Sequence, residues 1–195
     1  MENKQTFLNR LNSELSPKEL TRVRAAYIFA KFGHRAQKRK ELDNTGKQLR
    51  YFEHVRRVAL ILIDECDVRD PDIIITALLH DCFEDTVDID PAIVELFFGS
   101  KVCSNVLCLS KTANCNDNEY FNKLLRANSD VRLVKCCDRL DNLRSISGCD
   151  RDFIDKQVEE TEKYLEELFC FRDNDSLECP DAVVDEIREL VSVLR

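Results

Sequence analysis

Turn-forming residues are scarce in this sequence, which has four glycines, four prolines and no tryptophan among its 195 residues. Antiparallel sandwiches and barrels need a turn about every ten residues, and those turns are usually built on glycine or proline. The scarcity therefore argues against a β-rich fold. We expect an all-α fold, a compact multi-helix bundle.

Long apolar runs are also missing. No segment approaches the roughly 18 consecutive apolar residues needed to cross a bilayer, and the first ten residues, MENKQTFLNR, lack the apolar core of a secretion signal. A soluble, cytoplasmic protein with no membrane partner is expected. The 44% of residues that are apolar are enough for the core of one domain spanning residues 1–195.

A surplus of positive charge is absent too, because 37 acidic residues against 29 basic ones leave a net charge of −8. A protein that grips a nucleic-acid backbone usually carries the opposite sign. Nucleic acid is therefore not an expected partner, whereas a small anionic ligand could bind where basic residues gather. The oligomeric state is unknown from the sequence, since the amphipathic segment 181–194 fits packing within the chain or between subunits.

The ten cysteines form no CxxC pair. A zinc ribbon needs two closely spaced thiolate pairs, so that class of metal site is not expected. Most of the cysteines fall inside apolar helical patterns, as Cys103 and Cys108 do in SKVCSNVLCLSK. We interpret them as reduced thiols that act as small core side chains, with regulatory oxidation as the alternative.

Apolar residues recur with helical periodicity along most of the chain. Ser16-Pro17, Asp70-Pro71 and Asp90-Pro91 each place a capping side chain before a first-turn proline, which is a usual start of a helix. Residues 35–49 are polar and basic and contain a glycine, so we expect them to be mostly loop. The expected helices cover about residues 4–14, 17–33, 50–66, 70–85, 91–99, 101–112, 117–127, 130–146, 150–171 and 180–194.

A histidine and several carboxylates are concentrated in the segment ALLHDCFEDT at residues 77–86. On a regular helix four of these side chains fall within an arc of about 140°: His80, Asp81, Glu84 and Asp85. Three carboxylates so close together after an apolar stretch would be costly without a counter-charge, which a divalent cation would supply. The alternative is a solvent-exposed acidic helix end with an incidental histidine.

A polar stripe follows in the segment KCCDRLDNLRS. Asn142 and Ser145 lie four and seven residues after Asp138, so the three side chains share one helix face. A carboxylate, an amide and a hydroxyl in line suit a surface that faces a ligand, with the carboxylate as the metal ligand. His54 supplies a further imidazole, although a single histidine is more often a helix-surface or core residue.

Together, His54, His80-Asp81 and Asp138 match the ligand order H…HD…D of the HD superfamily of metal-dependent phosphohydrolases. The flanking sequence resembles the hydrolase domain of the RelA/SpoT homologue family, and the length resembles that of the stand-alone small alarmone hydrolases. The matching motifs span about residues 22–146, and helices at 150–195 follow them. These motifs are His34-x-x-Gln37-x-Arg39-Lys40, Tyr51-x-x-His54, Ala77–Thr86, Phe98–Val102, Ser110–Thr112 and Asp138–Ser145.

The resemblance implies an all-α HD-domain bundle with one manganese ion at a central site. It also implies removal of the 3′-pyrophosphate from guanosine tetra- or pentaphosphate, so a small nucleotide is the expected partner. The implied metal ligands are His54, His80, Asp81 and Asp138, and the implied catalytic acidic pair is Glu84 and Asp85. The implied nucleotide contacts are Arg39, Lys40, Asn142 and Ser145.

The chemistry of these residue types agrees with the implied roles. Two histidines and two carboxylates leave open coordination positions on an ion that prefers more ligands. Water held there becomes a nucleophile near neutral pH, and Glu84 could accept its proton with Asp85 assisting. The remaining phosphates need basic partners. The densest basic cluster is Lys38-Arg39-Lys40 with Lys47 and Arg50, and secondary candidates are Lys111 and Arg144.

The sequence departs from the family pattern at three places. Residues 41–49 (ELDNTGKQL) resemble an insertion in the loop that carries nucleotide contacts, and Ala36 and Arg50 replace the usual glycine and proline. Asp141 stands where the family normally has histidine, a position beside the metal ligands that could alter metal affinity. None of the implied metal ligands is changed, so an active enzyme is expected.

Two other hypotheses stay open. The same machinery could act on another nucleotide, such as an adenosine alarmone or the 2′-phosphate of NADPH. Alternatively, the chain could be a non-catalytic module that senses a nucleotide, although the intact Glu84 and Asp85 argue against this. The sequence does not decide between a role as an antitoxin against an alarmone synthetase and a role as a general alarmone regulator.

Overall fold

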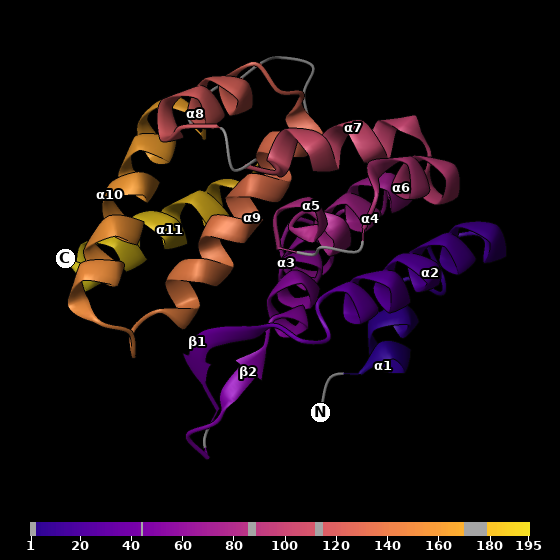
Figure 1. Cartoon of the computed structure of the whole chain (residues 1–195), viewed down its shortest axis with the longest axis horizontal. Helices are drawn as coiled ribbons and strands as arrows, with labels where there is room; N and C mark the ends of the chain where they lie inside the picture. Colours follow the sequence, from indigo (N-terminus) through magenta and orange to yellow (C-terminus); the bar gives the residue numbers. More distant parts are fainter. Residues whose placement is uncertain (1–2, 44, 86–88, 112–114, 170–178) are drawn as a thin grey trace.

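The structure is a computed structural model that describes residues 3–43, 45–85, 89–111, 115–169 and 179–195, with the side chain of Asp85 also outside the description. These ranges contain eleven helices and one two-stranded sheet (Figure 1), so the expected all-α fold is confirmed. The helices up to the middle of the chain are α1 (Lys4–Asn9), α2 (Pro17–Gly33), α3 (Phe52–Asp64), α4 (Pro71–Leu79), α5 (Cys82–Asp85) and α6 (Pro91–Phe98). The others are α7 (Ser100–Leu109), α8 (Asp117–Leu125), α9 (Ser129–Ser145), α10 (Arg151–Glu167) and α11 (Asp181–Leu194). No described helix is long and apolar enough to cross a membrane.

The three expected helix starts are confirmed. Ser16 begins α2 as part of a reciprocal capping box, in which its side chain accepts a hydrogen bond from the backbone N–H of Glu19. Asp70 and Asp90 cap α4 and α6 by accepting from the backbone N–H of Asp72 and Ala92, and each is followed by a proline in the first turn. These side chains satisfy backbone donors that a helix leaves unpaired at its N-terminus. The ends of these helices are therefore set locally by the sequence.

Helix α4 lies at the centre of the bundle, and every residue from Ile73 to Leu79 is buried. It packs against α2, α3 and α7, while α3 also packs against α9. Helices α10 and α11 cover the other side of α9 (Figure 1). Side chains from three distant parts of the sequence therefore meet where α3, the end of α4 and α9 converge.

The expectation that residues 35–49 are mostly loop is wrong. Two strands, β1 (Lys38–Leu42) and β2 (Gln48–Arg50), pair there as an antiparallel hairpin that projects from the bundle (Figure 1). Alternate residues of β1 are half-buried, because Arg39 and Glu41 point toward the helices and their neighbours point away. The half-buried residues of β1 are both polar, so the strand lacks the apolar alternation by which strands are recognised in a sequence.

The expected continuous helix over residues 70–85 is also wrong. Helix α4 ends at Leu79 and α5 begins at Cys82, so His80 and Asp81 lie in a turn between two helices. Successive side chains on a regular helix point about 100° apart. His80 keeps helical backbone angles (φ −56°, ψ −32°), but the helix is interrupted after it, so the 140° arc of one continuous helix does not apply to residues 80–85.

The cysteines behave as small side chains of the core. The nine described cysteines are free thiols, and Cys170 lies outside the described residues. Cys82, Cys103, Cys136 and Cys137 are buried, and the other described cysteines are half-buried. This placement agrees with their interpretation as reduced core residues.

Candidate metal centre and active site

Four side chains that can bind a metal converge between α3 and α9. His54 comes from α3, His80 and Asp81 from the turn after α4, and Asp138 from α9. One ligand atom from each of His54, His80 and Asp81 lies within 4.8 Å of the others. Asp138 Oδ1 lies 3.2 Å from His54 Nε2 and 3.8 Å from His80 Nε2. The structure thus brings together all four metal ligands that the resemblance implies.

The two imidazole rings are oriented by hydrogen bonds at their Nδ1 atoms. Nδ1 of His80 donates a hydrogen bond to the carbonyl oxygen of Ala77 at 2.8 Å, and Nδ1 of His54 donates to Asp141 Oδ2 at 2.7 Å. Each ring therefore directs the lone pair of Nε2 toward the common centre. Among the described residues, the buried Nε2 of His80 has no hydrogen-bond partner, which is costly for a buried nitrogen unless a further ligand occupies the position. This arrangement fits a bound divalent cation.

The two carboxylates are held by neighbours of their own. Asp81 Oδ2 accepts a hydrogen bond from the Tyr51 hydroxyl at 2.7 Å, and Asp138 Oδ1 accepts one from Asn142 Nδ2 at 2.8 Å. The second oxygen of Asp138 lies 2.9 Å from Lys135 Nζ, and this ion pair is buried. These contacts fix each carboxylate before a metal binds, as the partners of metal ligands commonly do.

The charges of the cluster support one another. Burial would lower the pKa of His80, but Asp81 and Asp138 raise it well above its usual range. Burial would raise the pKa of Asp138, but Lys135 and the two histidines hold it well below its usual range. The pKa of Asp81 is lowered by the same histidines. Both carboxylates are therefore ionised at neutral pH, as metal binding requires.

Glu84 stands beside this cluster on α5. Its carboxylate accepts a hydrogen bond from the backbone N–H of Lys111, which fixes one of its oxygens. Burial of the carboxyl group, together with the nearby charge of Asp81, raises the pKa of Glu84 to about 7. A carboxyl group with that pKa can accept and return protons near neutral pH. The backbone of Asp85 is part of α5, but its side chain lies outside the described residues.

A pocket of about 180 Å³ surrounds the cluster. Seven of the residues selected from the sequence line it: His54, His80, Asp81, Glu84, Lys111, Asp138 and Asn142. An adjoining pocket of about 190 Å³ is lined by Arg39, Lys40 and Ser145, and by the aromatic rings of Tyr51 and Phe153. Tyr51 lines both pockets, so the two spaces adjoin at this residue.

Arg39 links the two pockets. Its Nη2 donates to Asn142 Oδ1 at 2.8 Å and to Ser145 Oγ at 3.2 Å, and its guanidinium lies 5.6 Å from the centre of the Tyr51 ring. Lys40 is more exposed, with its ammonium group 3.8 Å from the centre of the Phe153 ring. The hairpin therefore brings Arg39 to within contact of the polar face of α9.

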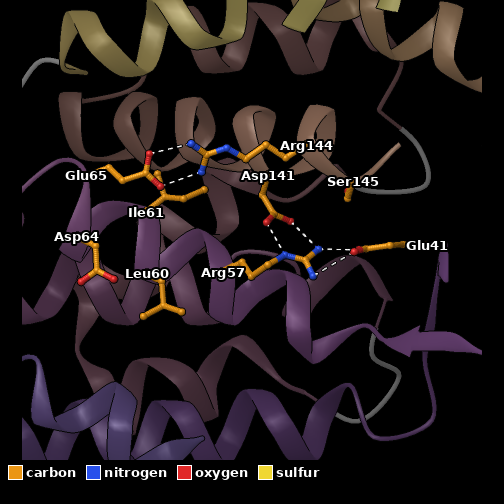
Figure 2. A pocket seen from close by; sticks show the side chains of 9 residues that line it. All are labelled: Glu41, Arg57, Leu60, Ile61, Asp64, Glu65, Asp141, Arg144 and Ser145. Atoms are coloured by element: carbon orange, nitrogen blue, oxygen red, sulfur yellow. Dashed lines mark hydrogen bonds and ion pairs between the residues drawn. The ribbon is translucent and has the colours of Figure 1, made fainter. Parts of the chain in front are cut away.

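Two basic candidates have other partners. Lys111 lines the metal pocket, but its ammonium group is paired with Asp117 at the surface. Arg144 does not lie with the rest, because it lines a separate cavity and forms an ion pair there with Glu65 (Figure 2). It also forms an ion pair with Glu186. The structure therefore separates Arg144 from the residues that line the metal pocket.

Two residues of the site were not selected from the sequence. Lys135 is buried and pairs with Asp138, and its presence within the apolar run VRLVKCC could have signalled an internal partner. Arg57 binds Asp141 through its Nε at 2.6 Å. It carries no such signal, because an arginine three residues after His54 fits an exposed helix face equally well.

The sequence profile of the HD domain matches residues 26–166 of this chain. A fruit-fly (Drosophila melanogaster) protein named guanosine-3′,5′-bis(diphosphate) 3′-pyrophosphohydrolase MESH1 is 34% identical over 122 residues, which span 60% of this chain and 65% of the fly protein. The human protein of the same name is 34% identical over 141 residues, or 67% of this chain and 73% of its own length.

A solved structure shares the fold over most of the chain. It is described as a metazoan ortholog of SpoT that hydrolyzes ppGpp and plays a role in starvation responses. It superposes with a TM-score of 0.69 at 28% identity, covering 86% of this chain and 94% of the other. The chain belongs to the HD domain family and, within it, to the hydrolase domains of the RelA/SpoT homologues.

Proposed function

We propose that this protein is a manganese-dependent hydrolase that removes the 3′-pyrophosphate from guanosine tetra- or pentaphosphate. The observation that carries the proposal is the convergence of His54, His80, Asp81 and Asp138 around the buried Nε2 atom of His80, which makes no hydrogen bond among the described residues. The names of the fly and human relatives support the choice of reaction and substrate.

Different residues would bind the metal, transfer the proton and position the ligands. A cation held by the four ligands would supply Lewis acidity at the attacked phosphate and would acidify water beside it. Glu84 then accepts the proton of the attacking water, since its carboxylate borders the same pocket and its pKa lies near neutrality. Tyr51 and Asn142 keep Asp81 and Asp138 in position throughout. Asp85 is proposed to assist Glu84.

The substrate is proposed to lie across the two adjoining pockets. Its 3′-pyrophosphate faces the metal pocket, which Lys111 and Asn142 line, and its nucleoside faces Arg39, Lys40, Ser145 and the ring of Tyr51. Arginine suits phosphate because its planar guanidinium donates two parallel hydrogen bonds. Manganese is proposed because two imidazoles and two carboxylates form a mixed nitrogen and oxygen set, which it accepts.

The deciding experiment measures pyrophosphate release from guanosine tetraphosphate by metal-stripped protein, with and without added Mn²⁺. We expect pyrophosphate release only when a metal is added, and a higher rate of release with Mn²⁺ than with Mg²⁺ or Zn²⁺. Adenosine tetraphosphate of the same phosphorylation pattern and NADPH are compared at equal concentration. Preferred turnover of either of these would transfer the proposal to that nucleotide, and binding of guanosine tetraphosphate without turnover of any substrate would favour a sensing module.

Arg39→Ala is expected to raise KM for the nucleotide by about 10- to 100-fold, because a hydrogen bond to a charged group contributes about 1.5–3 kcal/mol. The effect on kcat is expected to be smaller, since Arg39 contacts Asn142 and Ser145 and none of the four metal ligands. Steady-state kinetics measure both constants. Lys40→Ala is the matched comparison on the same strand, with a smaller expected rise in KM because Lys40 is more exposed. A larger effect from Lys40→Ala than from Arg39→Ala would contradict this assignment.

A further inference from the structure

A network of charged side chains extends from the metal cluster to the hairpin. It runs from His54 through Asp141 and Arg57 to Glu41, and Figure 2 shows the last three residues joined by hydrogen bonds. Asp141 is only 2% exposed. The residues of this network are contributed by α3, α9 and β1, so the network joins three elements of the fold.

The contacts of Arg57 hold Asp141 in one orientation. Nε of Arg57 donates to Asp141 Oδ1 at 2.6 Å, and Nη2 donates to Asp141 Oδ2 at 3.1 Å. Oδ2 is the same oxygen that accepts the hydrogen bond from His54 Nδ1. A two-point contact of this kind fixes the plane of the carboxylate, whereas a single contact leaves it free to rotate. The direction of the His54 ring therefore depends on Arg57.

The outer end of this network, at Glu41, positions the hairpin. Nη2 of Arg57 also donates to Glu41 Oε2 at 2.7 Å. Glu41 lies two residues after Arg39 on β1, so both side chains point to the same face of the strand. Arg39 contacts α9 and Glu41 contacts α3. These two contacts dock the hairpin against both helices that carry metal ligands.

The same cavity contains a second arginine with a different connection. Arg144 pairs with Glu65 at 2.8 Å (Figure 2) and also with Glu186 at 2.5 Å. Among the described residues, neither of these carboxylates contacts a candidate metal ligand. Arg57 and Arg144 thus line one cavity of about 290 Å³, and only Arg57 is joined to the metal cluster. Arg144 is therefore a matched control for Arg57.

We propose that Arg57 is a positioning residue of the metal centre, which orients His54 through Asp141 and couples the hairpin to the metal through Glu41. The inference rests on the metal site of the proposed function and does not depend on the identity of the nucleotide. It also explains how Asp141 serves at this position, because the aspartate accepts hydrogen bonds from both Arg57 and His54.

The test is isothermal titration of Mn²⁺ into metal-stripped protein without nucleotide. Arg57→Gln is expected to weaken Mn²⁺ binding by about tenfold, the lower end of the loss when a direct partner of a metal ligand is removed, because Arg57 acts on His54 through Asp141. Arg144→Gln is expected to retain the wild-type affinity. Wild-type affinity in a folded Arg57→Gln variant would overturn the inference, and so would an equal loss in Arg144→Gln.

Two further variants keep the test decisive. If circular dichroism shows that Arg57→Gln does not fold, Arg57→Lys replaces it, and a loss of about threefold or more is expected because lysine cannot make the two-point contact. Wild-type affinity of Arg57→Lys would then overturn the inference. Glu41→Gln leaves the contact between Arg57 and Asp141 intact, so its loss of affinity is expected to be smaller than that of Arg57→Gln.

Hydrogen exchange of the metal-stripped protein tests the coupling to the hairpin. Backbone amides of residues 38–50 are expected to exchange faster in Arg57→Gln and in Glu41→Gln than in wild type, and to be unchanged in Arg144→Gln. Unchanged exchange in both hairpin-contact variants would overturn the coupling. If the wild type binds Mn²⁺ but cleaves no nucleotide, only the proposed function fails, because neither measurement uses a substrate.

Discussion

Replacing Asp81 with alanine is expected to abolish Mn²⁺ binding and to reduce pyrophosphate release by at least about 10³-fold. Asp81 Oδ2 lies 3.1 Å from His80 Nε2 and supplies one of only two carboxylates in the cluster. Its removal takes away both a ligand atom and a negative charge that offsets the cation. A bound metal contributes several kcal/mol to phosphoryl transfer, and each 1.4 kcal/mol corresponds to about a factor of ten in rate.

Two measurements on the same protein check this prediction. Calorimetric titration gives the Mn²⁺ affinity, and a coupled assay gives pyrophosphate release at saturating metal. Asp185→Ala is the control, since Asp185 is exposed on α11 and, among the described residues, forms an ion pair with Arg188 on the same helix. Retention of Mn²⁺ binding and of turnover in Asp81→Ala would place the metal elsewhere and would contradict the proposed centre.

Replacing Glu84 with glutamine is expected to lower kcat by about 10²- to 10⁴-fold, the usual contribution of a general base. The amide retains an oxygen for the backbone N–H of Lys111, so the shape of the pocket is preserved. Mn²⁺ affinity is expected to stay within a few-fold of wild type, because Glu84 is outside the group of metal-binding atoms. Loss of kcat with retained metal binding therefore separates the role of Glu84 from that of Asp81.

The matched control is Glu160→Gln. Glu160 lines the same pocket but is held in an ion pair with Arg139 at 3.0 Å. Its replacement is expected to reduce kcat less than tenfold. If Glu160→Gln proves as damaging as Glu84→Gln, the loss reflects the charge of the pocket and not proton transfer by one residue.

The pH dependence provides a separate signature of Glu84. Its pKa of about 7 in the metal-free protein means that the carboxyl group loses its proton as the pH rises through neutrality. A general base works only when ionised, so kcat/KM is expected to rise with pH on the acid side. A bound cation favours the carboxylate and moves this rise to lower pH. The dependence of kcat/KM on pH, measured on both sides of neutrality, locates this rise, and Glu84→Gln is expected to lack it.

Local sequence features were sufficient for most helices. Capping residues with first-turn prolines correctly placed the starts of α2, α4 and α6, because each cap acts within a few residues of its own helix. The hairpin at residues 38–50 was missed for the opposite reason. Its inward side chains are Arg39 and Glu41, whose partners lie on α9 and α3, and no apolar alternation marks the strand.

The amino-acid sequence by itself determined the fold class and the identity of the candidate ligands. Scarce turn residues and helical periodicity indicated an all-α bundle, and the order of histidines and aspartates indicated an HD-type metal site. Both signals are local or depend only on order along the chain. They required no knowledge of which segments touch.

Only the tertiary structure decided how those residues act together. The turn at His80 and Asp81 replaces the expected continuous helix, and it lets two adjacent side chains face one point. Arg57 and Asp141 are 84 residues apart in the sequence and 2.6 Å apart in the bundle. Contacts of that range arise from the packing of α3 against α9, because hydrophobic burial brings the helices together whatever polar pairs they carry. The orientation of the metal ligands is therefore a property of the packed bundle.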